Sequence, residues 1–349
     1  MTLFFWDQLR LGIRTTSQQS GKPANSFVAR GALAIGATSM LLGATTGACG
    51  GGNDALSDDG RIKVVTTLPL FADFVRQIGG DRVEVTSLVP EGADPHTWEP
   101  APSDIQRVAE ADIAFANGLD LEPEAINVID ANLPDRVELV ALGEETARTG
   151  VTLVSSQEED EESEDEQPSE FEGANPHLWL NMENAELYAR VIRDALSDVG
   201  SGDVDEFDRN YEAYLNDLSE LDAYVRQRTN SIGSSQRKLV TTHDAFGYFA
   251  DYFRFEVVSF VADSPGQEPS PADVANLARA IEREGVPAVF VEPQISAESE
   301  ILRQAAEDAG VQVCTLYSDS LDDKVTSYIE LMHFNADELA RCLGGDGGG

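Results

Sequence analysis

The sequence predicts an α/β protein with two lobes, each containing a mostly parallel sheet flanked by helices. Short runs rich in β-branched residues alternate with amphipathic stretches from Arg61 onward, which is the pattern of βα units around a parallel sheet. These runs fall into two sets, separated by the long stretch 142–238. With 349 residues and 42% apolar content, the chain is long enough for a hydrophobic core in each lobe.

Four strands are expected in each lobe. In the first lobe they cover 62–66, 83–89, 113–116 and 137–141, and in the second 239–242, 257–261, 288–292 and 311–317. A helix starting near Ala272 is well marked, because Ser270 can cap it and Gly285 can end it.

A long helix is expected between the two sets of strands, over 204–233. Its apolar residues recur every three or four positions, which is the spacing of one helix face. They are Phe207, Tyr211, Tyr214, Leu218, Leu221 and Val225. No Gly or Pro interrupts 204–232, so an unbroken helix would be about 42 Å long. Periodicity alone leaves two readings open, a rigid rod joining the lobes or an ordinary packed helix of one domain.

The first 49 residues have the order of an export signal. An apolar run, 32–48, follows several basic residues and ends at Cys49. Small residues before Cys49 and a polar glycine-rich stretch after it resemble a bacterial lipoprotein signal, whose cysteine becomes lipidated. A plain signal peptide or a short membrane anchor is the alternative. We therefore expect an extracytoplasmic protein, with 50–60 as a flexible tether.

The chain is strongly acidic, with 24 Lys and Arg against 63 Asp and Glu and a formal net charge of −39. Such a field repels nucleic acid and attracts cations. The segment 157–173 is almost purely acidic and is expected to be a solvated loop, with a cation-collecting tether as the alternative. The charge is equally explained by a salty habitat, because acidic surfaces stay soluble at high ionic strength. A flexible tail is expected over 344–349.

Three of the four histidines lie where binding residues are expected in such a fold. The segments 94–98 (DPHTW) and 175–179 (NPHLW) repeat one pattern around His96 and His177, and proline should make each a stiff turn backed by an indole. His96, His243, Glu292 and Asp319 all follow expected strand ends, where ligands of open α/β sheets bind.

Imidazoles with a carboxylate suit zinc and also admit iron or manganese. Taken singly, each histidine is better explained as an ordinary loop residue, and only together do they indicate a metal site. The fourth, His333, is expected to be a plain helix residue.

Five motifs occur in order along the chain. They are GADPHTWEP at 92–100, NPHLWL at 175–180, THDAFGYF at 242–249, VFVEPQ at 289–294 and LYSDSL at 316–321. With these motifs the sequence resembles the zinc- and manganese-binding solute receptors of ABC transporters, the ZnuA/TroA-like or cluster A-I lipoproteins. The resemblance implies two α/β lobes, 61–203 and 234–343, joined by one long rigid linker helix, 204–233, with the metal in the cleft between them.

The resemblance also implies the roles of individual residues. By motif, His96 and His177 would be metal ligands from the first lobe, and His243 and Asp319 from the second. Glu292 is expected to orient a histidine rather than to bind the metal. The remaining supporting residues would be Trp98, Glu99 and Trp179. Three imidazoles with one carboxylate favour Zn²⁺ as the transported ligand, with Mn²⁺ or Fe²⁺ as alternatives.

The function implied by the resemblance is capture of a divalent metal ion and its delivery to an ABC transporter permease. Such a receptor is not an enzyme, and we expect a monomer held at the membrane through a lipid on Cys49. The alternatives are a metallohydrolase with Glu292 or Asp319 as general base, and a surface adhesin. Because each imidazole must lose its proton to bind metal, affinity should fall as the pH drops through about 6.5. Cys314 and Cys342 form either a disulfide or two buried thiols.

Overall fold

The computed structural model describes residues 60–156 and 170–344. The first lobe contains one sheet of four parallel strands in the order β2-β1-β3-β4. The strands are β1 (Ile62–Thr66), β2 (Val83–Ser87), β3 (Ile113–Ala116) and β4 (Leu139–Ala141). Strand β4 starts two residues later than expected, because the backbone N–H of Val137 closes a turn onto the carbonyl of Pro134. Strand β2 ends at Ser87, although Leu88 still donates to the carbonyl of Thr66.

The second lobe has parallel strands in two pairs rather than in one continuous sheet. The pairs are β5 (Lys238–His243) with β6 (Glu256–Ala262), and β7 (Ala288–Val291) with β8 (Gln312–Thr315). Strands β5 and β7 lie side by side, and the backbone N–H of Glu292 donates to the hydroxyl of Thr242 instead of to a strand carbonyl. His243 is the last residue of β5, one position further into the strand than the sequence indicated.

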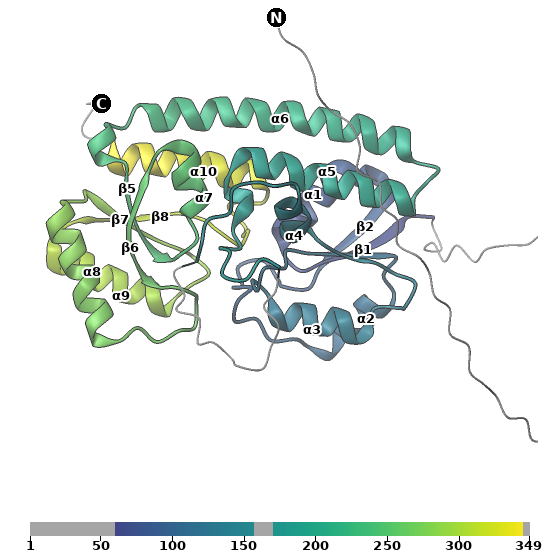
Figure 1. Cartoon of the computed structure of the whole chain (residues 1–349), viewed down its shortest axis with the longest axis horizontal. Helices are drawn as coiled ribbons and strands as arrows, with labels where there is room; N and C mark the ends of the chain where they lie inside the picture. Colours follow the sequence, from purple (N-terminus) through teal and green to yellow (C-terminus); the bar gives the residue numbers. More distant parts are fainter. Residues whose placement is uncertain (1–59, 157–169, 345–349) are drawn as a thin grey trace, which may run out of the picture. The chain divides into compact units, whose positions relative to one another are not determined.

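Helices cover both lobes (Figure 1). Those of the first lobe are α1 (Pro69–Gly79), α2 (Pro102–Ala109), α3 (Pro123–Asn132), α4 (Leu142–Arg148) and α5 (Met182–Val199). Those of the second are α7 (Gly247–Phe253), α8 (Pro271–Glu284), α9 (Ala297–Ala309) and α10 (Tyr328–Leu343). Short 3₁₀ turns are η1 (Gly80–Arg82), η2 (Leu178–Leu180) and η3 (Ser234–Gln236). Helix α8 follows the prediction, with a capping box formed by Ser270 and Asp273 and with Gly285 ending it at φ 60°.

The long helix α6 (Val204–Asn230) runs along both lobes (Figure 1). It packs against α1 and α5 of the first lobe and against α10 of the second. The buried residues on its inner face are Phe207, Tyr214, Leu218, Leu221, Val225 and Thr229. Tyr211 lies at the edge of this face and is only partly buried. Packing therefore resolves the alternative that periodicity left open, because α6 both connects the lobes and lies on each of them.

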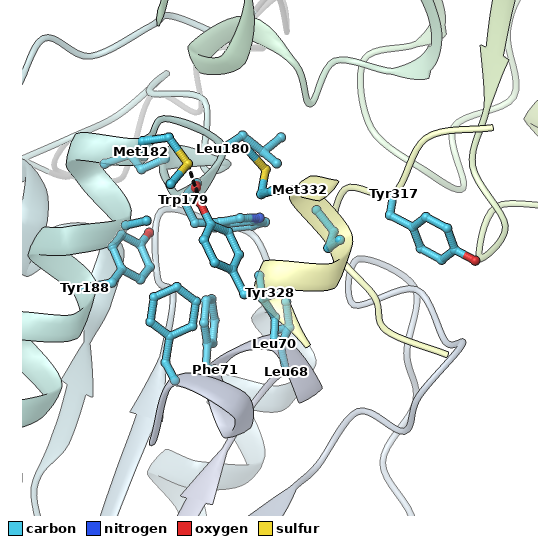
Figure 2. Close-up of a cluster of buried hydrophobic side chains, with 14 of the residues drawn as sticks. Leu68, Leu70, Phe71, Trp179, Leu180, Met182, Tyr188, Tyr317, Tyr328 and Met332 are labelled. Carbon is cyan, nitrogen blue, oxygen red and sulfur yellow. Dashed lines mark hydrogen bonds between the residues drawn. The ribbon is translucent and has the colours of Figure 1, made fainter. Parts of the chain in front are cut away.

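One aromatic cluster belongs to both lobes (Figure 2). The ring of Tyr328, at the start of α10, lies 4.9 Å from that of Phe74 in α1. The Tyr328 hydroxyl donates to the carbonyl of Trp179 at 2.7 Å, and its backbone N–H donates to Asp73 at 2.8 Å. Phe71 packs edge-on against the Trp179 indole. The first turn of α10 is therefore embedded in the core of the first lobe, which joins the lobes at a second place besides α6.

The remaining sequence expectations fall partly inside and partly outside the described residues. Cys314 of β8 and Cys342 of α10 form a disulfide with their Cα atoms 6.7 Å apart, and His333 packs its ring on Tyr224. Residues 1–59, including Cys49, the acidic segment 157–169 and the tail 345–349 lie outside the described part. Within 60–156 and 170–344, no helix is both long and apolar enough to cross a membrane.

The cluster at the start of α10 leads to a stability prediction. Tyr328→Phe should lower the free energy of unfolding by about 1–3 kcal/mol, because the buried carbonyl of Trp179 loses a donor. Urea unfolding of the metal-free protein measures this loss. Tyr224→Phe is the matched control, since its hydroxyl bonds Asp337 at an exposed position, and it should cost less than about 1 kcal/mol. Equal losses in the two variants would contradict the structural role of Tyr328.

Candidate metal centre

Four side chains that are far apart in the sequence converge between the two lobes. His96, His177, His243 and Asp319 each offer one donor atom, and these atoms lie within 4.8 Å of one another. The side chains of His243 and Asp319 are fully buried, that of His177 is 2% exposed and that of His96 is 8% exposed. His96 therefore lies on the solvent side of the group.

The three imidazoles direct the same atom toward the carboxylate. The Nε2 atoms of His177, His243 and His96 lie 3.2, 3.4 and 4.0 Å from the nearer oxygen of Asp319. The Nε2 of His96 and the Oδ1 of Asp319 are buried without a hydrogen-bond partner. Buried polar atoms are normally satisfied, so two unsatisfied ones within the same cluster of converging donor atoms fit a cation bound there.

Each imidazole is also held from behind through its other nitrogen, Nδ1. The partners are Asn175 Oδ1 for His177 at 2.9 Å, Glu292 Oε1 for His243 at 3.0 Å and Ser264 Oγ for His96 at 3.2 Å. Such partners orient a metal-binding imidazole and select the tautomer whose Nε2 lone pair faces the ion. The group that is hydrogen-bonded to Nδ1 therefore differs among the three rings: it is an amide, a carboxylate and a hydroxyl.

The repeated Asp/Asn-Pro-His motif forms the same turn twice. The backbone N–H of His96 donates to Asp94 Oδ1 at 3.1 Å, and that of His177 donates to Asn175 Oδ1 at 3.2 Å. In both turns the side chain two residues earlier accepts the bond and the intervening proline restricts the backbone. Asn175 also donates to the carbonyl of Asp244 at 2.6 Å, which ties the first-lobe loop to the chain just after His243.

The predicted supporting residues differ in where the structure places them. Trp179 packs its indole against His177 at 5.4 Å between ring centroids and donates to the carbonyl of Ser318 at 3.1 Å. Trp98 packs instead on a separate core cluster of the first lobe. The side chain of Glu99 is exposed and, among the described residues, bonds none of the four converging side chains. Exposure of Glu99 differs from the supporting position that was expected of it.

Glu292 lies behind His243 rather than among the four converging atoms. Its second oxygen accepts hydrogen bonds from Ser318 Oγ and from Gln294. Ser318 Oγ also lies 2.9 Å from Asp319 Oδ2, so one serine links both carboxylates of the second lobe. This position is that of a carboxylate that orients a histidine.

Burial and neighbouring charges shift the pKa values of the converging side chains in different directions. Burial lowers the pKa of His96 to about 3, and the neighbouring histidines add to this effect. Burial alone would also lower the pKa of His243, but the charge and hydrogen bond of Glu292, with the charge of Asp319, raise it to about 9. Burial opposes ionisation of Asp319, yet the facing histidines hold its pKa well below the ordinary value. At neutral pH His243 is therefore a buried cation between two carboxylates.

A buried network supports the loop of His177 from inside the first lobe. Asn117, at the end of β3, donates to the carbonyl of Pro176 at 2.9 Å and accepts from the hydroxyl of Tyr188 at 2.6 Å. Its backbone N–H donates to Glu122, which is fully buried and leaves one oxygen without a partner. A Cβ at Gly143 would lie 2.9 Å from the Asn117 carbonyl oxygen, so glycine is required where α4 passes this network.

Sequence reasoning did not assign roles to several residues that hold the site. The Asx-Pro-His spacing was a usable signal for Asp94 and Asn175, because it is the pattern of a turn closed by the first side chain. Ser264, Asn117 and Glu122 had no comparable local signal. Each meets its partner only through the packing of separate segments.

Comparison with known proteins places the chain among metal-binding transport proteins. The sequence model of the periplasmic zinc-uptake complex component A (ZnuA) matches residues 64–342. The manganese-binding lipoprotein MntA of Halalkalibacterium halodurans is 30% identical over 310 residues, which cover 87% of this chain and 96% of MntA. The zinc-binding protein TroA of Treponema pallidum is 33% identical over 300 residues, covering 84% of this chain and 92% of TroA.

The fold agrees with this similarity. The solved structure of the periplasmic zinc-binding protein TroA from Treponema pallidum matches with a TM-score of 0.70 and 30% sequence identity, covering 81% of this chain and 99% of that one. The two-lobed α/β architecture joined by a long helix is therefore confirmed.

Glu122 leads to a prediction about the pH dependence of stability. Burial raises its pKa from 4.5 to about 7, against hydrogen bonds from Asn117 and Thr67 that lower it. Between these values the folded protein keeps a proton that the unfolded chain releases, so the stability contributed by Glu122 falls as the pH rises. The shift corresponds to roughly 3 kcal/mol.

Glu122→Gln removes this titration, because glutamine stays neutral. The free energy of unfolding of Glu122→Gln, relative to the unsubstituted protein, should therefore increase by roughly 2.4 kcal/mol between about pH 5 and pH 7.5. Urea unfolding of the metal-free proteins at the two pH values gives this difference. Glu124→Gln is the control, because Glu124 lies in the first turn of α3, directly after Glu122, but is exposed. A relative stability that is the same at both pH values would show that Glu122 is not held neutral.

Proposed function

This chain belongs to the family of the periplasmic zinc-uptake complex component A, the substrate-binding proteins of metal ABC transporters, and we propose that it captures zinc for import. In this proposal Zn²⁺ is the cargo, held by His96, His177, His243 and Asp319. The observation that supports this proposal is the convergence of their donor atoms within 4.8 Å of one another. The Nδ1 atom of every imidazole is already hydrogen-bonded, which leaves Nε2 for the metal.

The donor set supports zinc over the other divalent ions. Three imidazole nitrogens and one carboxylate form a four-ligand set that zinc accepts in tetrahedral geometry. Manganese prefers a larger share of oxygen ligands than one carboxylate among three imidazoles provides. The relatives do not decide the metal by name, because MntA is described as manganese-binding and TroA as zinc-binding. Our choice therefore depends on the donor chemistry of this chain.

A four-ligand set also agrees with transport rather than catalysis. Catalytic zinc sites keep one position for a water or substrate, whereas four protein ligands close the tetrahedral shell. The relatives are named as binding proteins and not as enzymes. Capture followed by release to a partner is thus the chemistry that this site can perform.

We further propose the location and partner of the protein. MntA is named a lipoprotein, and Cys49 follows an apolar run in the manner of a lipidated cysteine. The proposal is an extracytoplasmic monomer anchored through Cys49, with 1–49 as signal and 50–60 as tether. The lobes 61–203 and 234–343, joined by 204–233, would present the ion to an ABC transporter permease.

Metal content is the direct test of this proposal. The purified protein should bind one zinc ion per chain, more tightly than manganese in competition calorimetry. His243→Ala should lose stoichiometric zinc at micromolar concentration, because it removes a ligand from a closed set. His333→Ala is the matched control and should bind like the unsubstituted protein, since this histidine packs on Tyr224. A preference for manganese would overturn the choice of metal, and no stoichiometric ion would refute the site.

The pKa of His243 adds a second prediction. Because this pKa is raised to about 9, the metal-free protein carries a proton on His243 at pH 7 that the ion must displace. Zinc binding should therefore release about one proton at pH 7 and weaken about tenfold per pH unit from about pH 8 to pH 6. Loss of affinity thus begins above the pH of about 6.5 expected for an unperturbed imidazole.

Calorimetry in two buffers of different ionisation enthalpy measures the released proton. The observed enthalpy should differ between the buffers by about one ionisation enthalpy. Identical enthalpies at pH 7 would show that His243 is already neutral in the metal-free protein.

A further inference from the structure

His96 differs from the other converging histidines in its exposure and in the origin of its partner. Its side chain is 8% exposed, against 2% and 0% for His177 and His243. The Asn175 that holds His177 belongs to the same loop, and Glu292 belongs to the same lobe as His243. The ring of His96, from the first lobe, is held by Ser264 of the second lobe. The outermost imidazole is thus oriented by a hydroxyl across the boundary between the lobes.

The loop that carries Ser264 is pressed against the first lobe. Gly266, at φ 83°, approaches Thr97 so closely that a Cβ there would lie 2.7 Å from the Thr97 methyl group. From behind, the buried carboxylate of Glu298 accepts the backbone N–H of Gly266 at 2.9 Å. Glu298 lies in the first turn of α9. The loop 263–266 is therefore anchored to its own lobe and reaches over to the loop of His96.

We propose that Ser264 is a positioning residue that sets the rate at which the bound metal leaves, by holding His96 over the solvent side of the site. This inference rests on the proposed metal-binding function. The ion must lose His96, the ligand nearest to solvent, before water reaches it from that side. A hydrogen bond to Nδ1 that fixes the ring opposes this first step, and partners of this kind affect metal affinity by about 10- to 100-fold.

The association rate should respond much less to the same contact. Encounter of a cation with the site depends on the long-range acidic field of the protein, and substitution of an uncharged serine leaves that field unchanged. Ser264 should therefore act on dissociation. A residue that merely stabilises the fold would not separate the two rates in this way.

Stopped-flow kinetics with zinc alone test the proposal. Release into an excess of a coloured chelator gives the dissociation rate, and mixing with zinc gives the association rate. Ser264→Ala should release zinc at least about tenfold faster, with an association rate within about twofold of the unsubstituted protein. Ser264→Thr keeps a hydroxyl and should restore slow release. Ser259→Ala, on the neighbouring strand β6, is the matched control, and zinc should leave it at the unsubstituted rate.

A second pair of variants tests the loop independently of Ser264. Gly266→Ala places a methyl group against Thr97 and should lift the loop from His96, so release should again accelerate about tenfold. Gly285→Ala controls for backbone strain, because Gly285 also has a positive φ of 60° but has no atom within 4 Å of its added Cβ. Thermal unfolding of the metal-free variants should show that Gly285→Ala loses stability, and the chelator assay should show that it does not release zinc faster.

The outcomes separate this inference from the proposed function. If the unsubstituted protein holds one zinc ion but Ser264→Ala releases it within twofold of the same rate, Ser264 does not control release. Equal acceleration in Ser259→Ala would likewise overturn the inference. Failure of the unsubstituted protein to bind zinc would instead refute the metal site itself.

Discussion

The two lobes share one hydrophobic core, and the candidate metal centre depends on it. The first turn of α10 places Tyr328 among the aromatic side chains of the first lobe, where it contacts Phe74 and bonds the Trp179 carbonyl. Helix α6 packs against helices of both lobes. Each buried aromatic side chain contributes on the order of 1.5–3 kcal/mol, far more than any exposed ion pair. Donor atoms from separate lobes can stay within 4.8 Å of one another only if this packing holds the lobes together.

The same burial explains the electrostatics of the centre. Removing the imidazoles from water favours their neutral form, and this effect dominates at His96. At His243 the carboxylate of Glu292 reverses it, so that a proton compensates the buried negative charge. A divalent ion would take over that compensation when it displaces the proton. The site thus pairs buried charges with one another, which avoids the cost of an isolated ion in the interior.

The supports of the centre differ between its inner and outer sides. The inner side is supported by buried hydrogen bonds. Asn117 and Glu122 are bonded to each other within the first lobe, and Asn175 donates to the carbonyl of Asp244. On the outer side, His96 meets a single hydroxyl from the loop 263–266. Networks whose members are all buried resist rearrangement more than a contact between two loops. This asymmetry is the physical basis of our proposal that the ion leaves on the side of His96.

Local patterns in the sequence determined much of the fold and of the site. The strands β1 and β3, the capped helix α8 and the long helix α6 all follow from side-chain periodicity and capping residues. The motifs around His96, His177, His243 and Asp319 identified the residues that the structure brings together. Tertiary packing alone decided the pairing of Cys314 with Cys342 and the split of the second sheet. It also decided the exposure of Glu99, the contact of Ser264 with His96 and the bond of Glu122 with Asn117. Periodicity and motifs report interactions between residues close in the chain, whereas these features depend on contacts between segments that meet only when the lobes are packed.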